Sequence, residues 1–208
     1  MPNLSVGKAE AGRVSDDAGF LELRVEELLD SVAARTPAPG GGASAAVVTA
    51  LAASLVAMAG RYADPVKIPA DLVDRADALR ARAGPLADAD AAAYGRYLKA
   101  RGMPSEPHDL RAEAMAVALT EAIDVPLSIL QTAAEVADLG RQLLLNGNPR
   151  LHGDAAAGVL FAAAAAETAA LLVAENMAGL PADPRARRAA VLAAGTRAIA
   201  VGVQPGAS

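Results

Sequence analysis

The chain has 208 residues, of which 53% are hydrophobic and only 2% aromatic, and its formal net charge is -5. This length supports one domain with its own core, and a negative chain has no net positive field for a phosphate backbone, so nucleic acid is not an expected partner. The sequence has no cysteine, which excludes disulfides, and no apolar signal segment in its first twenty residues, so we expect a cytoplasmic protein.

The scarcity of aromatic residues means that the interior must be built largely from alanine, leucine and valine. Alanine has the highest helix propensity, whereas β-branched and aromatic residues favour strands. We therefore predict an all-α fold, a single-domain bundle of about seven helices over residues 20–201. The tails, 1–19 and 202–208, are expected to be flexible.

The first predicted helix covers residues 20–34, where Leu21, Val25 and Leu29 repeat at helical spacing and form an apolar stripe that needs a partner. Residues 36–60 follow without a charge, and this length is enough to cross a bilayer. The stretch opens with prolines and glycines and continues mainly with weakly hydrophobic alanine, serine and threonine. We interpret it as a buried central helix and expect no membrane partner.

Further helices are predicted between residues 70 and 146. Apolar residues share one face through Gly84 and Pro85, a pair that should kink or restart the helix. Another helix begins near residue 109 and stops before Pro126, and the next extends from Pro126 to residue 146.

Residues 154–177 contain the run AAAGVLFAAAAA and are apolar nearly all round, so this helix should be buried on every side. Asp183 and Pro184 fit the N-cap and first turn of a last helix that ends near residue 199. Two alanine-rich helices that are apolar all round are more than a small monomeric bundle covers. We therefore expect a homodimer.

The segment TPAPGGGAS, residues 36–44, places three consecutive glycines at the start of the uncharged helix. Glycine lets a backbone approach a ligand closely, and the free amides of a helix start attract anions. A tight turn packed beneath other helices explains the same residues and is the commoner case. The segment is not a P-loop, because no Gly-Lys-Ser/Thr follows it.

Asp90 falls on the core-facing side of its predicted helix, four residues after Leu86. Burying an unpartnered carboxylate is costly, so Asp90 either pairs within the structure or works in a cleft with a shifted pKa, and the sequence leaves both open. Asp154 stands at the expected start of its helix, where N-capping is the ordinary role. The two histidines, His108 and His152, lack the ligand spacing of a metal site, so we expect no metal.

Taken in order, four segments resemble the cyclodeaminase/cyclohydrolase family, which includes the C-terminal part of formiminotransferase-cyclodeaminase and free-standing methenyltetrahydrofolate cyclohydrolases. These segments are VAARTPAPGGGAS at 32–44, LADADAAAY at 86–94, AIDVPLSIL at 122–130 and NGNPRLHGDAAAG at 146–158.

The resemblance implies an all-helical homodimer that takes a tetrahydrofolate derivative as substrate and holds no tightly bound cofactor. It implies a 5,10-methenyltetrahydrofolate cyclohydrolase or a 5-formiminotetrahydrofolate cyclodeaminase, with Asp90 in the place of the catalytic aspartate. The residues that it implies for substrate binding are Pro39, Gly40, Gly41, Gly42, Ser44, Tyr94, Asn148 and Asp154.

Five positions lack a polar or charged group that the family usually carries, among them a lysine at position 105. They are Ala43, Ala92, Ser105, Gly153 and Leu172. Losing one polar group from a preorganised site can cost several kcal/mol of transition-state stabilisation. The alternative prediction is therefore a catalytically altered helical dimer that binds a different small molecule or a protein partner. A third possibility is a shifted site, in which Lys99, Arg101 or Arg111 replaces the missing lysine.

Overall fold

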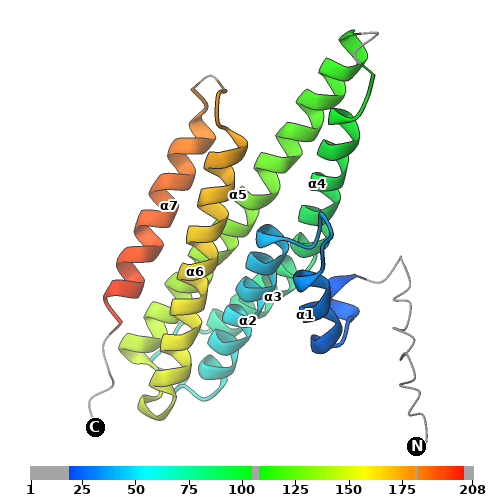
Figure 1. The fold of residues 1–208 in the computed structure, drawn as a ribbon. Coiled ribbons are helices and arrows are strands. Elements are labelled where there is room, and N and C mark those ends of the chain that lie inside the picture. The colour runs from blue at the N-terminus through cyan, green and yellow to red at the C-terminus, as the bar shows by residue number, and fades with distance from the viewer. Residues whose placement is uncertain (1–18, 105–107, 181, 204–208) are drawn as a thin grey trace, which may run out of the picture.

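The structure is a computed structural model in which residues 19–104, 108–180 and 182–203 are described. These residues form helices and no strand, which confirms the all-α prediction (Figure 1). Residues 1–18 and 204–208 of the expected tails lie outside the described residues, and so does Ser105.

The helices follow one another with short connections. After a 3₁₀ turn, Phe20–Glu22, the first part of the chain contains α1 (Val25–Ala33), α2 (Gly41–Arg61), α3 (Leu72–Ala83) and α4 (Leu86–Arg101). The second part contains α5 (His108–Asn146), a 3₁₀ turn Pro149–Leu151, α6 (His152–Asn176) and α7 (Pro184–Val201). Helices α2, α5 and α6 pack together at the centre, with α7 against α5 and α6, and α3 and α4 against α2 and α5 (Figure 1).

Two helix boundaries test the sequence predictions directly. Gly84 and Pro85 separate α3 from α4, so the predicted restart is confirmed. The predicted break before Pro126 is wrong, because α5 continues through it as one helix. Proline cannot donate to the carbonyl four residues earlier, that of Ala122, and the Asn176 side chain of α6 supplies the donor instead, at 2.7 Å. The helix therefore tolerates its internal proline.

The two alanine-rich helices, α2 and α6, differ in how much of their surface is covered. The segments Gly41–Arg61 and Pro149–Asn176 are both long and apolar enough to cross a membrane, but 61% and 39% of their apolar windows are buried inside the molecule. Helix α2 is thus a core helix, as predicted. Helix α6 departs from the prediction of burial on every side, because Leu160, Phe161 and Leu171 are 48%, 44% and 59% exposed.

Helices α2 and α6 are antiparallel and in close contact. A Cβ on Gly158 of α6 would lie 3.0 Å from Val56 Cγ2, so this glycine lets the helices approach. The Asn148 side-chain amide donates to the Tyr62 carbonyl at 3.0 Å, which places the start of α6 beside the end of α2. The glycine-opened start of α2 lies at the opposite end, about 30 Å away for a helix of this length.

Helix α1 keeps its apolar stripe uncovered. None of its residues is buried, and Val25 and Leu29 are exposed. The turn before it is attached to α4, because the backbone N–H of Phe20 donates to Asp88 Oδ1 at 2.9 Å. Of the predicted stripe, Leu21 packs against Gly84, but Val25 and Leu29 are not covered by the described part of the same chain.

Candidate active site

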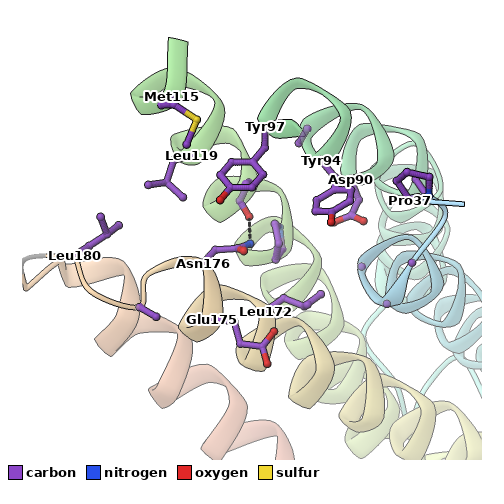
Figure 2. Close-up of a pocket in the computed structure, with 18 residues that line it drawn as sticks. Pro37, Asp90, Tyr94, Tyr97, Met115, Leu119, Leu172, Glu175, Asn176 and Leu180 are labelled. Carbon is purple, nitrogen blue, oxygen red and sulfur yellow. Dashed lines mark hydrogen bonds between the residues drawn. The ribbon is translucent and has the colours of Figure 1, made fainter. Parts of the chain in front are cut away.

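A cavity of about 470 Å³ opens at the end of the bundle where α2 begins and α6 ends. The loop before α2 and the first residues of that helix form one wall, and α4, α5 and the end of α6 form the others. The side chains that α4, α5 and α6 contribute include Asp90, Tyr94, Tyr97, Met115, Leu119, Leu172, Glu175 and Asn176 (Figure 2). A volume of this size is typical of small-molecule sites.

Asp90 reaches from α4 to the start of α2. The backbone N–H of Ala43 donates to its carboxylate, whereas the N-cap residue Gly40 has no side chain to cap the helix. A Cβ on Gly42 would lie 2.1 Å from Asp90 Oδ1 and 2.4 Å from its Cγ, so only glycine leaves room for the carboxylate. Asp90 therefore combines the two roles left open by the sequence: it satisfies a helix start, and it faces the cavity.

The environment of Asp90 also changes its acidity. Burial raises the pKa of the Asp90 carboxyl above its ordinary value, and the Ala43 N–H offsets part of that rise. A carboxyl group with a raised pKa takes up and releases a proton at a higher pH than an exposed aspartate does. This is the property that a general acid or base near neutral pH requires.

Two tyrosines extend the α4 wall beyond Asp90. The ring centroids of Tyr94 and Tyr97 are 6.4 Å apart with an interplanar angle of 23°, and both side chains line the cavity (Figure 2). Tyr97 was not among the sequence candidates, although its place seven residues after Asp90 puts it on the same side of the helix. The pair gives the cavity an aromatic wall.

The α5 and α6 walls are joined by the hydrogen bond between Asn176 and Ala122 (Figure 2). Ala122, Pro126 and Asn176 all line the cavity. Pro126 leaves the Ala122 carbonyl without its helical donor, and the Asn176 amide fills that place across the helix interface. Asn176, which the sequence analysis missed, thus fixes the end of α6 against α5.

This assignment predicts strong coupling between Pro126 and Asn176. We expect Asn176→Ala to lower the free energy of unfolding by about 1–3 kcal/mol, since it leaves a half-buried carbonyl without a donor. In a Pro126→Ala background the α5 backbone regains its own N–H, so the same substitution should cost clearly less. Denaturant unfolding of the four proteins measures this, and equal costs in both backgrounds would contradict the role of Asn176.

The cavity carries negative charge. Asp90 and Glu175 are its ionisable carboxylates, and no lysine, arginine or histidine lines it in the part of the chain that the structure describes. Lys99 and Arg101 are exposed on α4, and Arg111 donates to the Arg101 carbonyl at 3.3 Å. None of these three cations lines the cavity, so the shifted-site alternative has no support. Within the described ranges no three His, Asp or Glu side chains group as metal ligands.

The structure brings together only part of the predicted substrate-binding set. Gly40, Gly41, Gly42 and Tyr94 line the cavity with Asp90. The other predicted residues do not line it; they are Pro39, Ser44, Asn148 and Asp154. Pro39 is buried in the loop, and the Ser44 hydroxyl donates back to the Gly40 carbonyl at 2.9 Å.

Asn148 and Asp154 lie at the opposite end of the bundle in the same chain, because α6 is antiparallel to α2. The N-cap expected at Asp154 is wrong: α6 begins at His152 after the N-cap Leu151, and Asp154 follows in the first turn. The negative charge of Asp154 still lies at the N-terminus of α6, the positive end of the helix dipole.

The positions that differ from the usual family pattern do not all lie at the cavity. The Ala43 amide holds Asp90, and Leu172 lines the cavity, so these two bear on the site directly. Ala92 is exposed on α4, and Gly153 is exposed at the start of α6.

Comparison with known proteins shows which family this sequence belongs to. The family model of formiminotransferase-cyclodeaminase matches residues 24–194. A methenyltetrahydrofolate cyclohydrolase from Methylorubrum extorquens is 36% identical over 173 residues, which cover 78% of this chain and 82% of the relative. The chain belongs to the formiminotransferase-cyclodeaminase family.

Two further comparisons concern a longer relative and a solved structure. The formimidoyltransferase-cyclodeaminase of Sus scrofa is 33% identical over 148 residues, but the match covers only 27% of that protein. The crystal structure of formiminotetrahydrofolate cyclodeaminase from Thermotoga maritima has a TM-score of 0.73 at 24% identity and covers 88% of this chain and 92% of its own. This structural likeness shows the common fold.

Proposed function

We propose that the protein is a folate one-carbon enzyme that acts on a C–N bond of a tetrahydrofolate derivative, and that it hydrolyses 5,10-methenyltetrahydrofolate. The observation that carries this proposal is the Asp90 carboxylate, held at the glycine-opened start of α2 and facing a cavity with an aromatic wall. The Methylorubrum relative, a cyclohydrolase by name, matches over most of its length, which favours hydrolysis over cyclodeamination.

The charges of the cavity suit this substrate. The methenyl bridge joins two nitrogens and carries a delocalised positive charge, and the cavity offers two carboxylates, Asp90 and Glu175, and no lining cation among the described residues. The stacked rings of Tyr94 and Tyr97 provide a flat surface against which a bicyclic ring system can lie. The proposed hydrolysis does not require a tightly bound cofactor.

Asp90 provides the proton transfers of the hydrolysis. The oxygen of a water molecule adds to the methenyl carbon, and the water proton passes to the ionised Asp90. The bond from that carbon to N5 then breaks as Asp90 returns the proton to N5, and the remaining hydroxyl loses its proton to solvent as the formyl group forms. Cation and water thus give 10-formyltetrahydrofolate and one proton. The same carboxylate can serve cyclodeamination, where N10 attacks a 5-formimino carbon and ammonia leaves.

We also propose that the enzyme is a homodimer. Helix α6 exposes Leu160, Phe161 and Leu171, and α1 exposes Val25 and Leu29, although all five are apolar. A second copy would remove these side chains from water and cover the exposed apolar surface of these helices.

The test of the reaction is spectroscopic. The methenyl compound absorbs in the near ultraviolet and its hydrolysis product does not, so we expect the purified protein to remove this absorbance faster than buffer alone. Faster appearance of the same absorbance from 5-formiminotetrahydrofolate would assign cyclodeaminase activity instead. Background rates in both assays would remove the enzyme and leave the alternative, a catalytically altered helical dimer that binds another small molecule or a protein.

A further inference from the structure

Helices α2 and α6 lie side by side (Figure 1), and apolar side chains on the outer side of both are at least partly exposed. We call this surface the α2–α6 face. Its members are Leu51, Leu55 and Met58 of α2 with Leu160, Phe161 and Ala164 of α6. Among the described residues, α2 carries no charge before Arg61, and α6 carries none between Asp154 and Glu167. An exposed apolar surface without charge is typical of a site of association.

The two ends of the α2–α6 face carry different charged groups: the cavity end has carboxylates alone among its described lining residues, whereas the other end has Arg150 together with Asp154 of the first turn of α6. At the cavity end lie the carboxylates of Asp90 and Glu175, with no lining cation in the described ranges. At the other end Arg150 is exposed and forms no ion pair with any residue that the structure describes. The backbone N–H of Arg150 donates to Asn148 Oδ1 at 3.0 Å, which fixes the turn that carries it. Two copies of this face are therefore complementary when they pack antiparallel, because each cavity end then meets the Arg150 end of the other copy.

Two symmetric arrangements can cover this face with a second copy. A two-fold axis parallel to the helices would bring cavity against cavity and Arg150 against Arg150, and like charges repel. An axis perpendicular to α6 and level with Phe161 would instead bring each cavity end against an Arg150 end. Arg150, in the 3₁₀ turn that leads into α6, and Leu172 are each eleven residues from Phe161, so an axis at Phe161 places the two at about the same level.

We infer that the substrate site is completed across this perpendicular two-fold axis, with Arg150 of the partner subunit at the mouth of the cavity, where it binds the carboxylates of the folate's glutamate tail. This inference rests on the proposed function for the identity of the ligand, but not for the packing of the two copies. Arginine suits the task because its planar guanidinium holds a carboxylate with two parallel hydrogen bonds. Glu175 lines the same cavity and would pair with that guanidinium when no substrate is bound.

The arrangement also accounts for two residues that a single chain leaves far from the cavity. Asn148 becomes a positioning residue, since its side chain holds both the Tyr62 carbonyl and the backbone of Arg150. Asp154 is seven residues before Phe161 and Thr168 is seven after it, so the partner's Asp154 arrives level with Thr168, a neighbour of Gly41. Both predicted positions thus return to the cavity, but from the other subunit.

Disulfide cross-linking tests the packing without any assay of activity. The chain has no cysteine, so Arg150→Cys combined with Leu172→Cys introduces the only thiols. Within one chain these positions are separated by most of the length of α6, about 30 Å, and a disulfide needs Cα atoms within about 7 Å. We expect the double variant to form covalent dimers on mild oxidation. The matched control, Arg75→Cys with Leu172→Cys, replaces an exposed arginine of α3 and should stay uncrosslinked.

Three results of that experiment would overturn the inference. The first is a monomeric wild-type mass by light scattering, whether or not the protein binds phospholipid vesicles. The second is a dimer in which the double variant forms no more covalent dimer than the control. The third is covalent dimer formation by Arg150→Cys alone that is as efficient as that of the double variant. The last result would indicate the parallel axis.

Subunit mixing tests the shared site itself. We expect Arg150→Ala to raise KM for the methenyl substrate roughly ten-fold with a smaller change in kcat, because a charge-assisted contact to the tail is lost. Arg75→Ala, an exposed surface substitution, should leave both values unchanged. A purified heterodimer of one Asp90→Asn chain and one Arg150→Ala chain then contains one intact site, so its kcat/KM should be about half that of wild type.

A site confined to one chain predicts a different heterodimer. Its kcat/KM would be half that of the Arg150→Ala homodimer, and this result would overturn the shared site. If the wild type hydrolyses no folate, the proposed function and the role of Arg150 in tail binding fail together, whereas cross-linking still decides how the copies pack.

Discussion

Replacing Asp90 with asparagine is expected to reduce the turnover of 5,10-methenyltetrahydrofolate by about 10²–10⁴-fold, the usual contribution of a general acid–base group. Asparagine keeps the shape of the side chain, and its oxygen can still accept from the Ala43 N–H that holds Asp90. The substitution therefore removes proton transfer while leaving the start of α2 capped. The rate of absorbance loss at saturating substrate measures it.

The same variant should show normal or increased thermal stability. Burial raises the pKa of Asp90 in the folded state above its value in the unfolded chain. The ionised carboxylate is therefore less favourable in the folded protein than in the unfolded chain, and its ionisation lowers stability. In wild type, this group lets stability rise as pH falls through the raised pKa, and Asp90→Asn should remove that contribution. The activity of wild type should change in the opposite sense, decreasing as pH falls through the same pKa, because the base must be ionised.

Asp88→Asn is the matched control for Asp90→Asn. It makes the same change of charge two residues earlier on α4, and Asp88 accepts from the backbone of Phe20 and does not line the cavity. We expect it to retain wild-type turnover. Equal activity of Asp90→Asn and Asp88→Asn would remove Asp90 from the chemistry, and a strongly lowered Tm of Asp90→Asn would show that its role is structural.

Local rules predicted the parts of the site that depend on one helix. The apolar spacing around Asp90 was enough to turn it inward, and three glycines at a helix start indicated a close approach. The structure shows that Gly42 is needed for that approach, because Asp90 fills the space of its missing Cβ. Asp183, predicted as an N-cap, likewise accepts from the Arg185 N–H at 2.8 Å.

Features that depend on packing between helices distant in the sequence could not be predicted in this way. A proline in a helix implies an orphan carbonyl four residues earlier, but nothing in the sequence says that Asn176 supplies the donor. The same limit applies to Asn148 and Asp154: the family segments place them in order along the chain, and only the antiparallel packing of α2 and α6 shows that they lie far from the cavity of their own chain.

Adding a single methyl group at Gly42 is expected to inactivate the enzyme nearly as completely as Asp90→Asn does. The Cβ of Gly42→Ala would lie 2.1 Å from Asp90 Oδ1, far inside contact distance, so the carboxylate must rotate away and lose the Ala43 N–H. Because the carboxylate is the end of a side chain that can move, we expect the free energy of unfolding to fall by only about 1–3 kcal/mol. Turnover and denaturant unfolding are measured on the same preparation.

A double-mutant cycle separates this mechanism from a general disturbance of α2. Asp90→Ala vacates the space that the new methyl needs, so Gly42→Ala should cost little stability in that background, and turnover should fall no further. Gly95→Ala, in α4 with nothing within 4 Å of its added Cβ, is the control for glycine replacement and should be neutral or slightly stabilising. The contact between Gly42 and Asp90 would lose its assigned role if Gly42→Ala kept full turnover, or if it cost as much with Asp90→Ala as without it.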